Sequence, residues 1–504
     1  MSATQIGALT TSQIQSLKAA DWQGLTTSQA TGLQTNQIQA ITPSVIVSLS
    51  TAVINSLSTS QIDAFTPAEM AAMSSGQVNA LTTAQVNSLG TSQVASLTAG
   101  EVVGLTTDQV QSGLSTSQVA ALSATAVTGL NSAQIRALTT AQVQSLSTRD
   151  VAALTAAQVN ALTTAQVNSL TTAQVAALTA GQVVGLSTDQ VHSGLSTSQV
   201  AALSATAVTG LNSAQIQALT TAQVQSLSTA DVAALKASQL GSLTTDQVQS
   251  GLSTSQVAAL SATAVTGLNS AQIQALTTTQ VQSLSARDVA ALTTAQVNAL
   301  TTAQVNSLTT AQVAALTAGQ VVGLSTDQVQ SGLSTSQVAA LSATAVTGLN
   351  SAQIQALTTT QVQSLSTRDV AALGSAQVNA LTTAQVNSLT TAQVAALTAS
   401  GVAGLSTNQI QNGLSTTQVA ALSAADAAAL STAQIQALTT NQVQGLSTTD
   451  VTALKTSQIE ALTTSQISNF TNAQLGALAY QQIAALSTAQ MQALSTAQIA
   501  YLHL

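Results

Sequence analysis

The feature that most constrains this chain is a repeat of eight residues that runs almost from end to end. Segments such as "LTTAQVNS" begin with Leu, place Ser or Thr second and Gln fifth, and place Val or Ile sixth. The Leu position, sometimes taken by another large apolar residue, recurs from Leu9 to Leu502. A solenoid lengthens by adding repeats without adding a new core. We therefore expect residues 1–504 to form a single continuous octapeptide-repeat solenoid.

A larger unit is marked by a glycine inserted in front of the repeated Leu. The inserted residues are spaced 81, 57, 81 and 81 positions apart, so the larger unit holds about ten octads and the short one lacks three. Glycine is favoured just after a helix C-terminus, where the backbone turns left-handed. We expect each of these glycines to end a short helix: Gly113, Gly194, Gly251, Gly332 and Gly413.

Each octad carries the signals of a helix start. Ser or Thr followed three residues later by Gln, Asp or Glu forms a capping box, and the flanking Leu and Val occupy the two positions of a hydrophobic staple. Both prolines, Pro43 and Pro67, stand one place after the Thr, where a first helical residue belongs. The sequence predicts an all-α superhelical spiral of one-and-a-half-turn helices, one per eight residues. Leu and Val or Ile should face inward, and Thr, Ser, Gln and Asn outward.

The alternative is a β-solenoid with eight residues per face, in which three octads make a 24-residue coil. The loss of three octads from the short unit suits this idea, and Thr and Val favour strands. However, strict alternation along a strand would put the Leu and the Val five residues later on opposite faces. The helical spiral is therefore the favoured fold.

Composition excludes several classes of partner. The chain has seven Lys and Arg against 15 Asp and Glu, no Cys and two His, with a net charge of −8. Binding of nucleic acid requires a basic surface, which is lacking here. No apolar run is long enough to span a membrane, so we expect no membrane insertion. The N-terminus shows no basic segment followed by an apolar core, so export would follow a signal-less route.

Catalytic motifs are also missing. His192 lies three residues after Asp189, which with the abundant Ser suggests a Ser/His/Asp set. The equivalent residue in other units is Gln, so His192 is interpreted as a surface residue. No phosphate-binding glycine loop or pair of catalytic carboxylates is present. We predict that the protein is not an enzyme and carries no cofactor, with calcium as the one ion worth testing.

Two sets of residues are candidates for binding. Aspartates recur before four of the five glycine insertions, where the N-terminus of a helix favours them or where they could bind Ca²⁺: Asp108, Asp189, Asp246 and Asp327. Arginine stands beside a capping-box aspartate in several units, which suggests ion pairs between chains. With two tyrosines near the C-terminus, the assembly candidates are Arg149, Asp150, Arg287, Asp288, Arg368, Asp369, Tyr480 and Tyr501.

The expected outer surface is regular and nearly uncharged. Surface charge normally keeps proteins apart, and head-to-tail contacts that do not close produce filaments. The leading hypothesis is a structural, self-assembling extracellular filament or surface-layer protein whose main partner is itself. The alternative is a monomeric adhesin stalk or ligand-binding rod for a glycan, a host protein or, less favoured, ice.

Runs such as "ALTTAQVNALTTAQVNSLTTAQVAAL" resemble low-complexity repeats of large bacterial surface proteins, often labelled as adhesion or haem-utilisation proteins. The resemblance covers the whole chain and rests on the one octad. It implies a location at the bacterial cell surface and a role in adhesion. The haem label would imply ligands that this chain lacks beyond two unpaired His and four Met.

Overall fold

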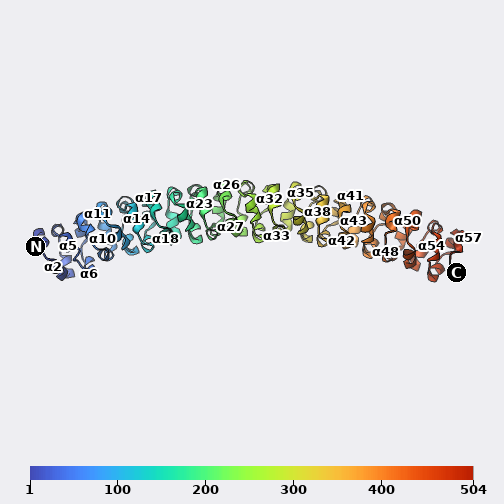
Figure 1. Ribbon diagram of the computed structural model, residues 1–504, viewed down its shortest axis with the longest axis horizontal. Helices are drawn as coiled ribbons and strands as arrows, with labels where there is room; N and C mark the ends of the chain where they lie inside the picture. Colours follow the sequence, from blue (N-terminus) through green and yellow to red (C-terminus); the bar gives the residue numbers. More distant parts are fainter. Residues whose placement is uncertain (503–504) are drawn as a thin grey trace. The chain divides into compact units, whose positions relative to one another are not determined.

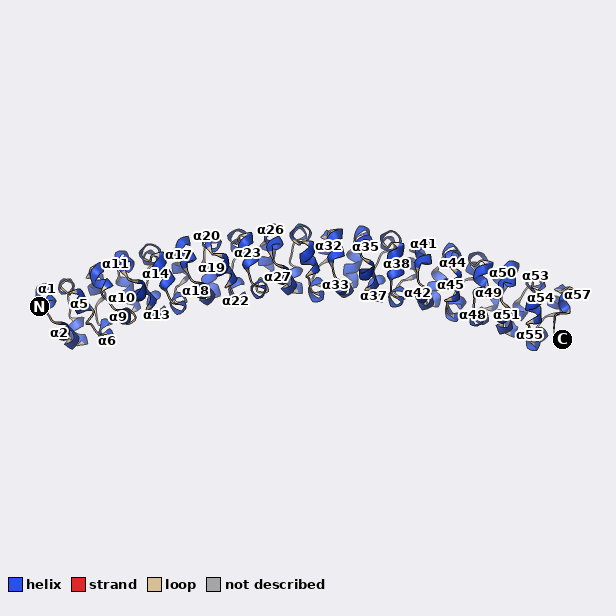
Figure 2. Ribbon diagram, viewed as in Figure 1, coloured by secondary structure: helices blue, strands red, loops and turns tan. Residues whose placement is uncertain are grey.

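The computed structural model describes residues 1–502, which contain helices and no strand (Figure 2). The chain divides into two compact units, Met1–Ala259 and Leu260–Leu504, each described here by itself. In each unit the short helices follow one another in chain order along the unit (Figure 1). The all-α repeat solenoid is confirmed, and the β-solenoid alternative is wrong for the described residues.

The first unit contains the following α-helices and π-helices (η): α1 (Ala3–Gly7), α2 (Thr11–Ser16), α3 (Ala19–Gln23), α4 (Thr27–Ala30), α5 (Thr35–Ile38), α6 (Pro43–Ile46), α7 (Thr51–Ser56), α8 (Thr59–Asp63), α9 (Pro67–Met70), α10 (Ser75–Ala80), α11 (Thr83–Ser88), α12 (Thr91–Ala95), α13 (Ala99–Val102), η1 (Gln109–Gly113), α14 (Thr116–Ala121), α15 (Ala124–Val127), α16 (Ser132–Ala137), α17 (Thr140–Ser145), α18 (Thr148–Ala153), α19 (Ala156–Ala161), α20 (Thr164–Ser169), α21 (Thr172–Ala176), α22 (Ala180–Val183), η2 (Gln190–Gly194), α23 (Thr197–Ala202), α24 (Ala205–Val208), α25 (Ser213–Ala218), α26 (Thr221–Ser226), α27 (Thr229–Ala234), α28 (Ala237–Leu240), η3 (Gln247–Gly251) and α29 (Thr254–Ala258).

The second unit contains α30 (Ala262–Val265), α31 (Ser270–Ala275), α32 (Thr278–Ser283), α33 (Ala286–Ala291), α34 (Thr294–Ala299), α35 (Thr302–Ser307), α36 (Thr310–Ala314), α37 (Ala318–Val321), η4 (Gln328–Gly332), α38 (Thr335–Ala340), α39 (Ala343–Val346), α40 (Ser351–Ala356), α41 (Thr359–Ser364), α42 (Thr367–Ala372), α43 (Ser375–Ala380), α44 (Thr383–Ser388), α45 (Thr391–Ala395), α46 (Ala399–Ala403), η5 (Gln409–Gly413), α47 (Thr416–Val419), α48 (Ala424–Ala429), α49 (Thr432–Ala437), α50 (Thr440–Gly445), α51 (Thr448–Ala453), α52 (Thr456–Ala461), α53 (Thr464–Ser468), α54 (Asn472–Gly476), α55 (Tyr480–Ala484), α56 (Thr488–Ala493) and α57 (Thr496–Ile499).

The capping box starts most of these helices, as predicted. In α11, the Thr82 hydroxyl accepts from the Gln85 backbone N–H at 3.2 Å, and the Gln85 Oε1 accepts from the Thr82 backbone N–H at 2.7 Å. Both prolines are confirmed as first helical residues, of α6 and α9. Local sequence thus sets where each helix begins.

Three octads make one turn of the solenoid, which we call a coil. Each helix packs against the helix three elements earlier, as α11 does on α8 and η1 does on α11. The helices of each unit therefore form three columns. The 24-residue coil that the β-solenoid alternative required is present, but its three sides are helices. A one-and-a-half-turn helix is stable here because its neighbours in the column bury it.

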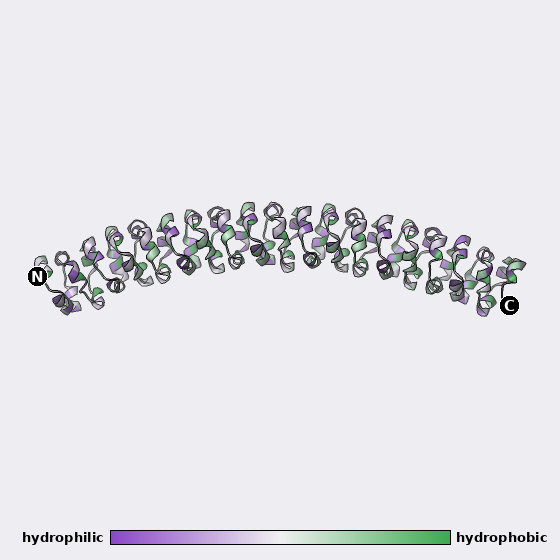
Figure 3. Ribbon diagram, viewed as in Figure 1, coloured by the Kyte–Doolittle hydropathy of each residue, from purple (hydrophilic) through white to green (hydrophobic). Residues whose placement is uncertain are grey.

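The core lies inside the three columns. Val86 is fully buried and Leu89 is 5% exposed, and the same two positions are buried in almost every octad. Trp22, Phe65 and Phe470 take these positions and are buried as well. Figure 3 shows hydrophobic and hydrophilic residues alternating along the chain, with no long run of either kind. The predicted inward Leu and Val or Ile are confirmed.

The inserted glycines do not act as predicted. No described glycine has a positive φ, so the expected left-handed helix end is wrong. Instead, the extra residue widens the last turn into a π-helix, in which the Leu114 N–H donates to the Gln109 carbonyl at 2.9 Å. The site is tight, because a Cβ on Gly113 would lie 3.1 Å from Cγ1 of Val86 in the preceding coil and would require Val86 to shift.

The larger unit places its π-helices on successive columns. Ten octads are three coils plus one octad, so η1, η2 and η3 lie one in each column of the first unit; they pack on α11, α20 and α26. The short unit lacks 24 residues, which is one whole coil, and keeps this order. Each of the three columns therefore receives one π-helix, with its one extra residue, in turn.

Candidate functional site

Glutamine at the third helical position joins each coil to the coil before it. Gln166 is 2% exposed, and its Oε1 accepts from the Thr163 backbone N–H at 2.7 Å. Its Nε2 donates to the carbonyl oxygens of Ile135 at 2.9 Å and Leu138 at 2.6 Å. The prediction that Gln faces outward is wrong at this position. One side chain thereby pairs three backbone groups that burial would otherwise leave without partners.

The acceptors lie at the corners of the coil. We define a corner as the segment from the inward Val or Ile near the end of a helix to the capping residue after the next Leu, such as Ile135–Thr139. In the second unit, Gln466 donates to Ile435 at 2.8 Å and Leu438 at 2.6 Å. Because an amide side chain both accepts and donates, Gln fits a position that must do both. Glutamate or aspartate can cap the helix there but, when ionised, cannot donate to the corner below.

A second set of hydrogen bonds joins the coils along their sides. Asn160 and Asn168 donate from Nδ2 to the carbonyls of Gly185 at 2.7 Å and Gly194 at 3.2 Å, in the next coil. Asn379 makes the same bond to Gly404 at 2.9 Å in the second unit. These Asn residues are exposed, so their bonds contribute less than those of the buried glutamines.

At the third helical position of six helices, a buried aspartate takes the place of the glutamine that donates to a corner. These aspartates are at most 3% exposed, and in Asp150 the Oδ2 accepts from the Ser147 N–H at 2.9 Å and from its hydroxyl at 2.6 Å. The capping role expected for them is confirmed. The six are Asp150, Asp231, Asp288, Asp369, Asp426 and Asp450.

The arginines beside these aspartates are separated from them by burial. Arg149, Arg287 and Arg368 are exposed, whereas Asp150, Asp288 and Asp369 are buried in their capping boxes. The predicted Arg–Asp pairs therefore do not face a second chain together, because only the arginines reach the surface. A cavity of about 270 Å³ lies beside Asp369, lined also by Arg368, Leu341 and Ser342.

Replacing Asp369 with Gln is expected to raise the free energy of unfolding by about 1–2 kcal/mol. The longer amide would keep the bond to the Ser366 N–H and add donors toward the corner at Leu341. Urea denaturation measures the change, with exposed Asp327→Asn as the control for removing one charge. Equal effects of the two substitutions would contradict the role given to the corner amide.

The calcium candidates do not come together. Asp108, Asp189, Asp246 and Asp327 are exposed and stand singly before successive π-helices. Within residues 1–502, no group of three His, Asp or Glu side chains could hold a metal ion. His192 is exposed on η2, with Nδ1 2.7 Å from the Ala218 carbonyl oxygen. Tyr480 and Tyr501 are 78% and 47% exposed.

Glu69 takes the place of the glutamine that donates to a corner in α9, and one of its carboxylate oxygens is buried without a hydrogen-bond partner. It is 1% exposed; its Oε2 accepts from the Thr66 N–H at 2.5 Å, and its Oε1 is buried without a partner. Burial raises the pKa of the carboxyl above its usual value, although the bonds from Thr66 oppose this. The helices packed on α9 are α6 and α12, and neither carries a charged residue.

We expect the Glu69→Gln variant to gain stability over the wild type as pH rises. Since the folded pKa is raised, the folded state binds the proton more tightly than the unfolded state. The stability of the wild type relative to the Gln variant is therefore fully present below the unfolded pKa, near 4.5, and lost as pH rises through the folded pKa. Thermal unfolding from pH 4 to pH 8 measures this. A constant difference across that range, or the same trend in exposed Glu460→Gln, would contradict it.

Sequence could have pointed to these corners through one signal. A capping box accepts Gln, Glu or Asp at the third helical position, yet this chain has Gln at that position in most of its helices. Capping alone does not require that choice. The preference for the side chain that also donates indicates an acceptor outside the octad.

Comparison with known proteins identifies the repeat. The model of the ALTTAQ repeat matches twelve segments that together cover more than half of the chain: residues 46–75, 67–99, 113–148, 147–180, 194–229, 226–262, 286–318, 331–367, 366–399, 424–456, 443–480 and 469–503. This match shows a repeat protein, while the adhesion role implied by the resemblance to surface proteins stays a prediction.

Two further comparisons add little. No curated protein matches the chain. Among solved structures, the leucine-rich repeat-containing protein LegL7 from Legionella pneumophila aligns at 13% identity and a TM-score of 0.17, over 49% of this chain and 83% of that one. A TM-score this low carries no argument. None of the described helices is both long and apolar enough to cross a membrane. By the repeat that it carries, the chain belongs to the ALTTAQ repeat family.

Proposed function

We propose that this protein is a structural, self-assembling filament component that works outside the cell, at the cell surface or in a matrix. One observation carries the proposal: the contact between successive coils is made by the same groups at most corners of each unit. Gln166 and Gln466 make equivalent bonds to equivalent corner carbonyls. A contact that fits any coil onto any other can also join coils of different molecules.

The surface supports this proposal. Charged residues make up 4% of the chain, far below the share in ordinary soluble domains. Charge repulsion between copies is therefore weak, and among the described residues no group of three His, Asp or Glu side chains could hold a metal ion. The extracellular location rests on the absence of Cys and on the resemblance to bacterial surface proteins.

Negative-stain electron microscopy of the purified chain at micromolar concentration tests the proposal. We expect fibres longer than one molecule, both with and without a calcium chelator, because the exposed aspartates stand apart. Single particles in both conditions would contradict self-assembly and favour the monomeric stalk. Fibres that disappear on chelation would contradict the expectation that assembly needs no metal, and would assign a cation to the exposed aspartates.

A further inference from the structure

The first coil carries the donor half of the contact that joins coils. Gln5 in α1 and Gln13 in α2 cap their own helices, with Oε1 accepting from Ser2 at 2.7 Å and from Thr10 at 2.9 Å. Both residues are exposed, whereas the equivalent Gln37 of the second coil is buried and donates to the first coil. The Nε2 groups of Gln5 and Gln13 find no acceptor among the described residues. We call this face the donor edge.

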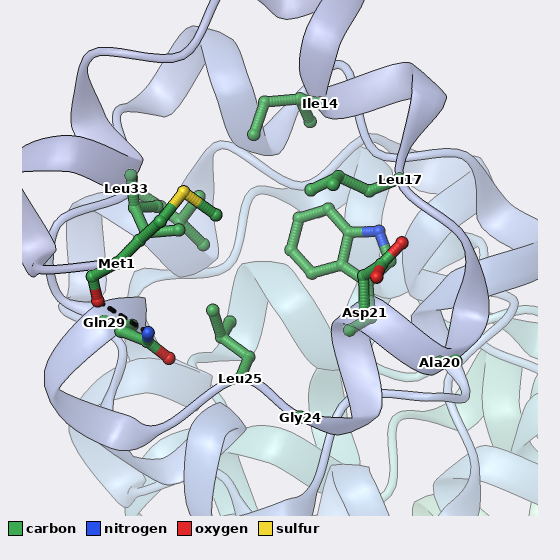
Figure 4. A pocket seen from close by; sticks show the side chains of 11 residues that line it. Met1, Ile14, Leu17, Ala20, Asp21, Gly24, Leu25, Gln29 and Leu33 are labelled. Atoms are coloured by element: carbon green, nitrogen blue, oxygen red, sulfur yellow. Dashed lines mark hydrogen bonds between the residues drawn. The ribbon is translucent and has the colours of Figure 1, made fainter.

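The donor edge also exposes part of the core. A cavity of about 340 Å³ opens among the first helices, and Ile14, Leu17 and Leu25 converge on it (Figure 4). Leu9, Leu17 and Leu25 are half-buried here, although the same position is buried in nearly all later octads. An apolar opening of this kind gains stability when another coil covers it.

The last coil carries the acceptor half. The final bonds of the series are made by Gln482, Gln490 and Gln498, which donate to corners one coil earlier. Three further corners follow those that these glutamines contact, and within residues 1–502 no later coil lies on them. Their carbonyl groups belong to Leu475 and Leu478, to Ile483 and Leu486, and to Met491 and Leu494. The side chains of Leu486, Met491 and Ile499 are half-buried beside these corners. We call this face the acceptor edge.

We infer that the donor edge of one copy of this chain binds the acceptor edge of a second copy, so that the junction repeats the contact found between coils inside each unit. Gln5 and Gln13 donate to two corners of the partner, and its half-buried apolar side chains cover the cavity. Asp21 takes the third corner and caps its helix as the six buried aspartates do, with its carboxylate accepting from the Lys18 N–H at 2.8 Å. This inference rests on the proposed function and names its interface.

The contact is polar in direction, because donors lie on one edge and acceptors on the other. Two copies therefore join head to tail, and each junction leaves one donor edge and one acceptor edge open for further copies. Lateral contacts through the exposed Arg149, Arg287 and Arg368 would be insensitive to changes at the edges. This difference allows a direct test.

Variants that block one edge each provide the experiment. Gln5→Glu with Gln13→Glu keeps both capping boxes, since Glu serves there in α9, but places carboxylates against carbonyls at the junction. The matched control is Gln15→Glu with Gln23→Glu, which adds the same charge at exposed positions of α2 and α3. Met491→Glu blocks the acceptor edge, with exposed Gln492→Glu as its control.

Sedimentation velocity of each variant and of mixtures is the readout. We expect each edge variant alone to assemble at least about a hundredfold more weakly than the wild type, and each control to assemble like it. A mixture of the two edge variants should stop at dimers, because one open donor edge meets one open acceptor edge. Circular dichroism confirms that each variant is folded, and the Gln5/Gln13 pair is exposed enough to leave folding unchanged.

The outcomes separate the inference from the proposed function. If both edge variants form fibres as long as those of the wild type, the head-to-tail junction is overturned while self-assembly itself stands. Mixtures of the edge variants that grow beyond dimers would overturn it too. A wild-type chain that stays monomeric at every concentration would overturn the proposed function itself.

Discussion

Replacing Gln166 with Glu is expected to lower the free energy of unfolding at pH 7 by about 3 kcal/mol. The substitution preserves shape and keeps an oxygen to accept from the Thr163 N–H. It replaces the Nε2 donor with an oxygen that faces the Ile135 and Leu138 carbonyls, at positions where the amide now lies 2.9 and 2.6 Å away. An acceptor against two acceptors in a buried corner is repulsive, and an ionised carboxylate adds the cost of burying its charge.

Acid should restore part of this loss. Once protonated, the carboxyl introduced by this substitution can donate to one of the two carbonyls, so we expect the effect to shrink as pH falls toward 4. Urea denaturation gives the free energy, and hydrogen exchange around residues 135–138 shows whether the loss starts at this corner. Gln144→Glu, on the exposed face of α17, adds the same charge without facing a corner. Equal losses in both variants would contradict the account.

Gly185→Ala is expected to lower the free energy of unfolding by about 1–3 kcal/mol, whereas Gly181→Ala raises it by up to about 1 kcal/mol. A Cβ on Gly185 would lie 2.5 Å from the carbonyl oxygen of Ala156, in the helix of the preceding coil. A Cβ on Gly181, inside α22, meets nothing nearer than the Thr179 hydroxyl at 4.0 Å. The same substitution four residues apart should therefore have opposite signs.

The opposite signs separate steric contact from helix propensity. Alanine favours a helix over glycine at Gly181 inside α22, and Gly185, which follows the helix, has no positive φ that would disfavour alanine, so backbone preference alone predicts that neither variant loses stability. Only the close approach of α22 to α19 accounts for a loss at Gly185. Paired urea titrations of the two variants measure it. A gain at both sites would show that successive coils are not packed as closely as the structure has them.

Sequence predicted the local structure of this chain well because its helix starts are local. The Thr82 and Gln85 capping box, Pro43, Pro67 and the inward Val86 all depend on contacts within about one octad. A single octad contains the information for these features. The repeat then carries the same result along each unit.

The features that sequence missed depend on the size of the coil. Gln166 is buried because its amide reaches corner carbonyls 28 and 31 residues earlier, and those lie beneath it only when three helical octads close a coil. Gly113 ends a π-helix without a left-handed φ, and its Cβ position lies close to Val86 of the preceding coil, a contact that the local sequence does not contain. Asp369 is buried for the same reason as the glutamines. These properties follow from stacking, which the periodicity of one octad does not contain.

Cryo-electron microscopy of assembled wild-type protein tests most directly whether one contact both holds the coils together and joins the molecules. The account predicts that the three columns continue across each junction, with Gln5 and Gln13 of one copy seated over corners of the acceptor edge of the next. Density in which copies lie side by side, or in which Gln5 and Gln13 face solvent at the junction, would contradict it.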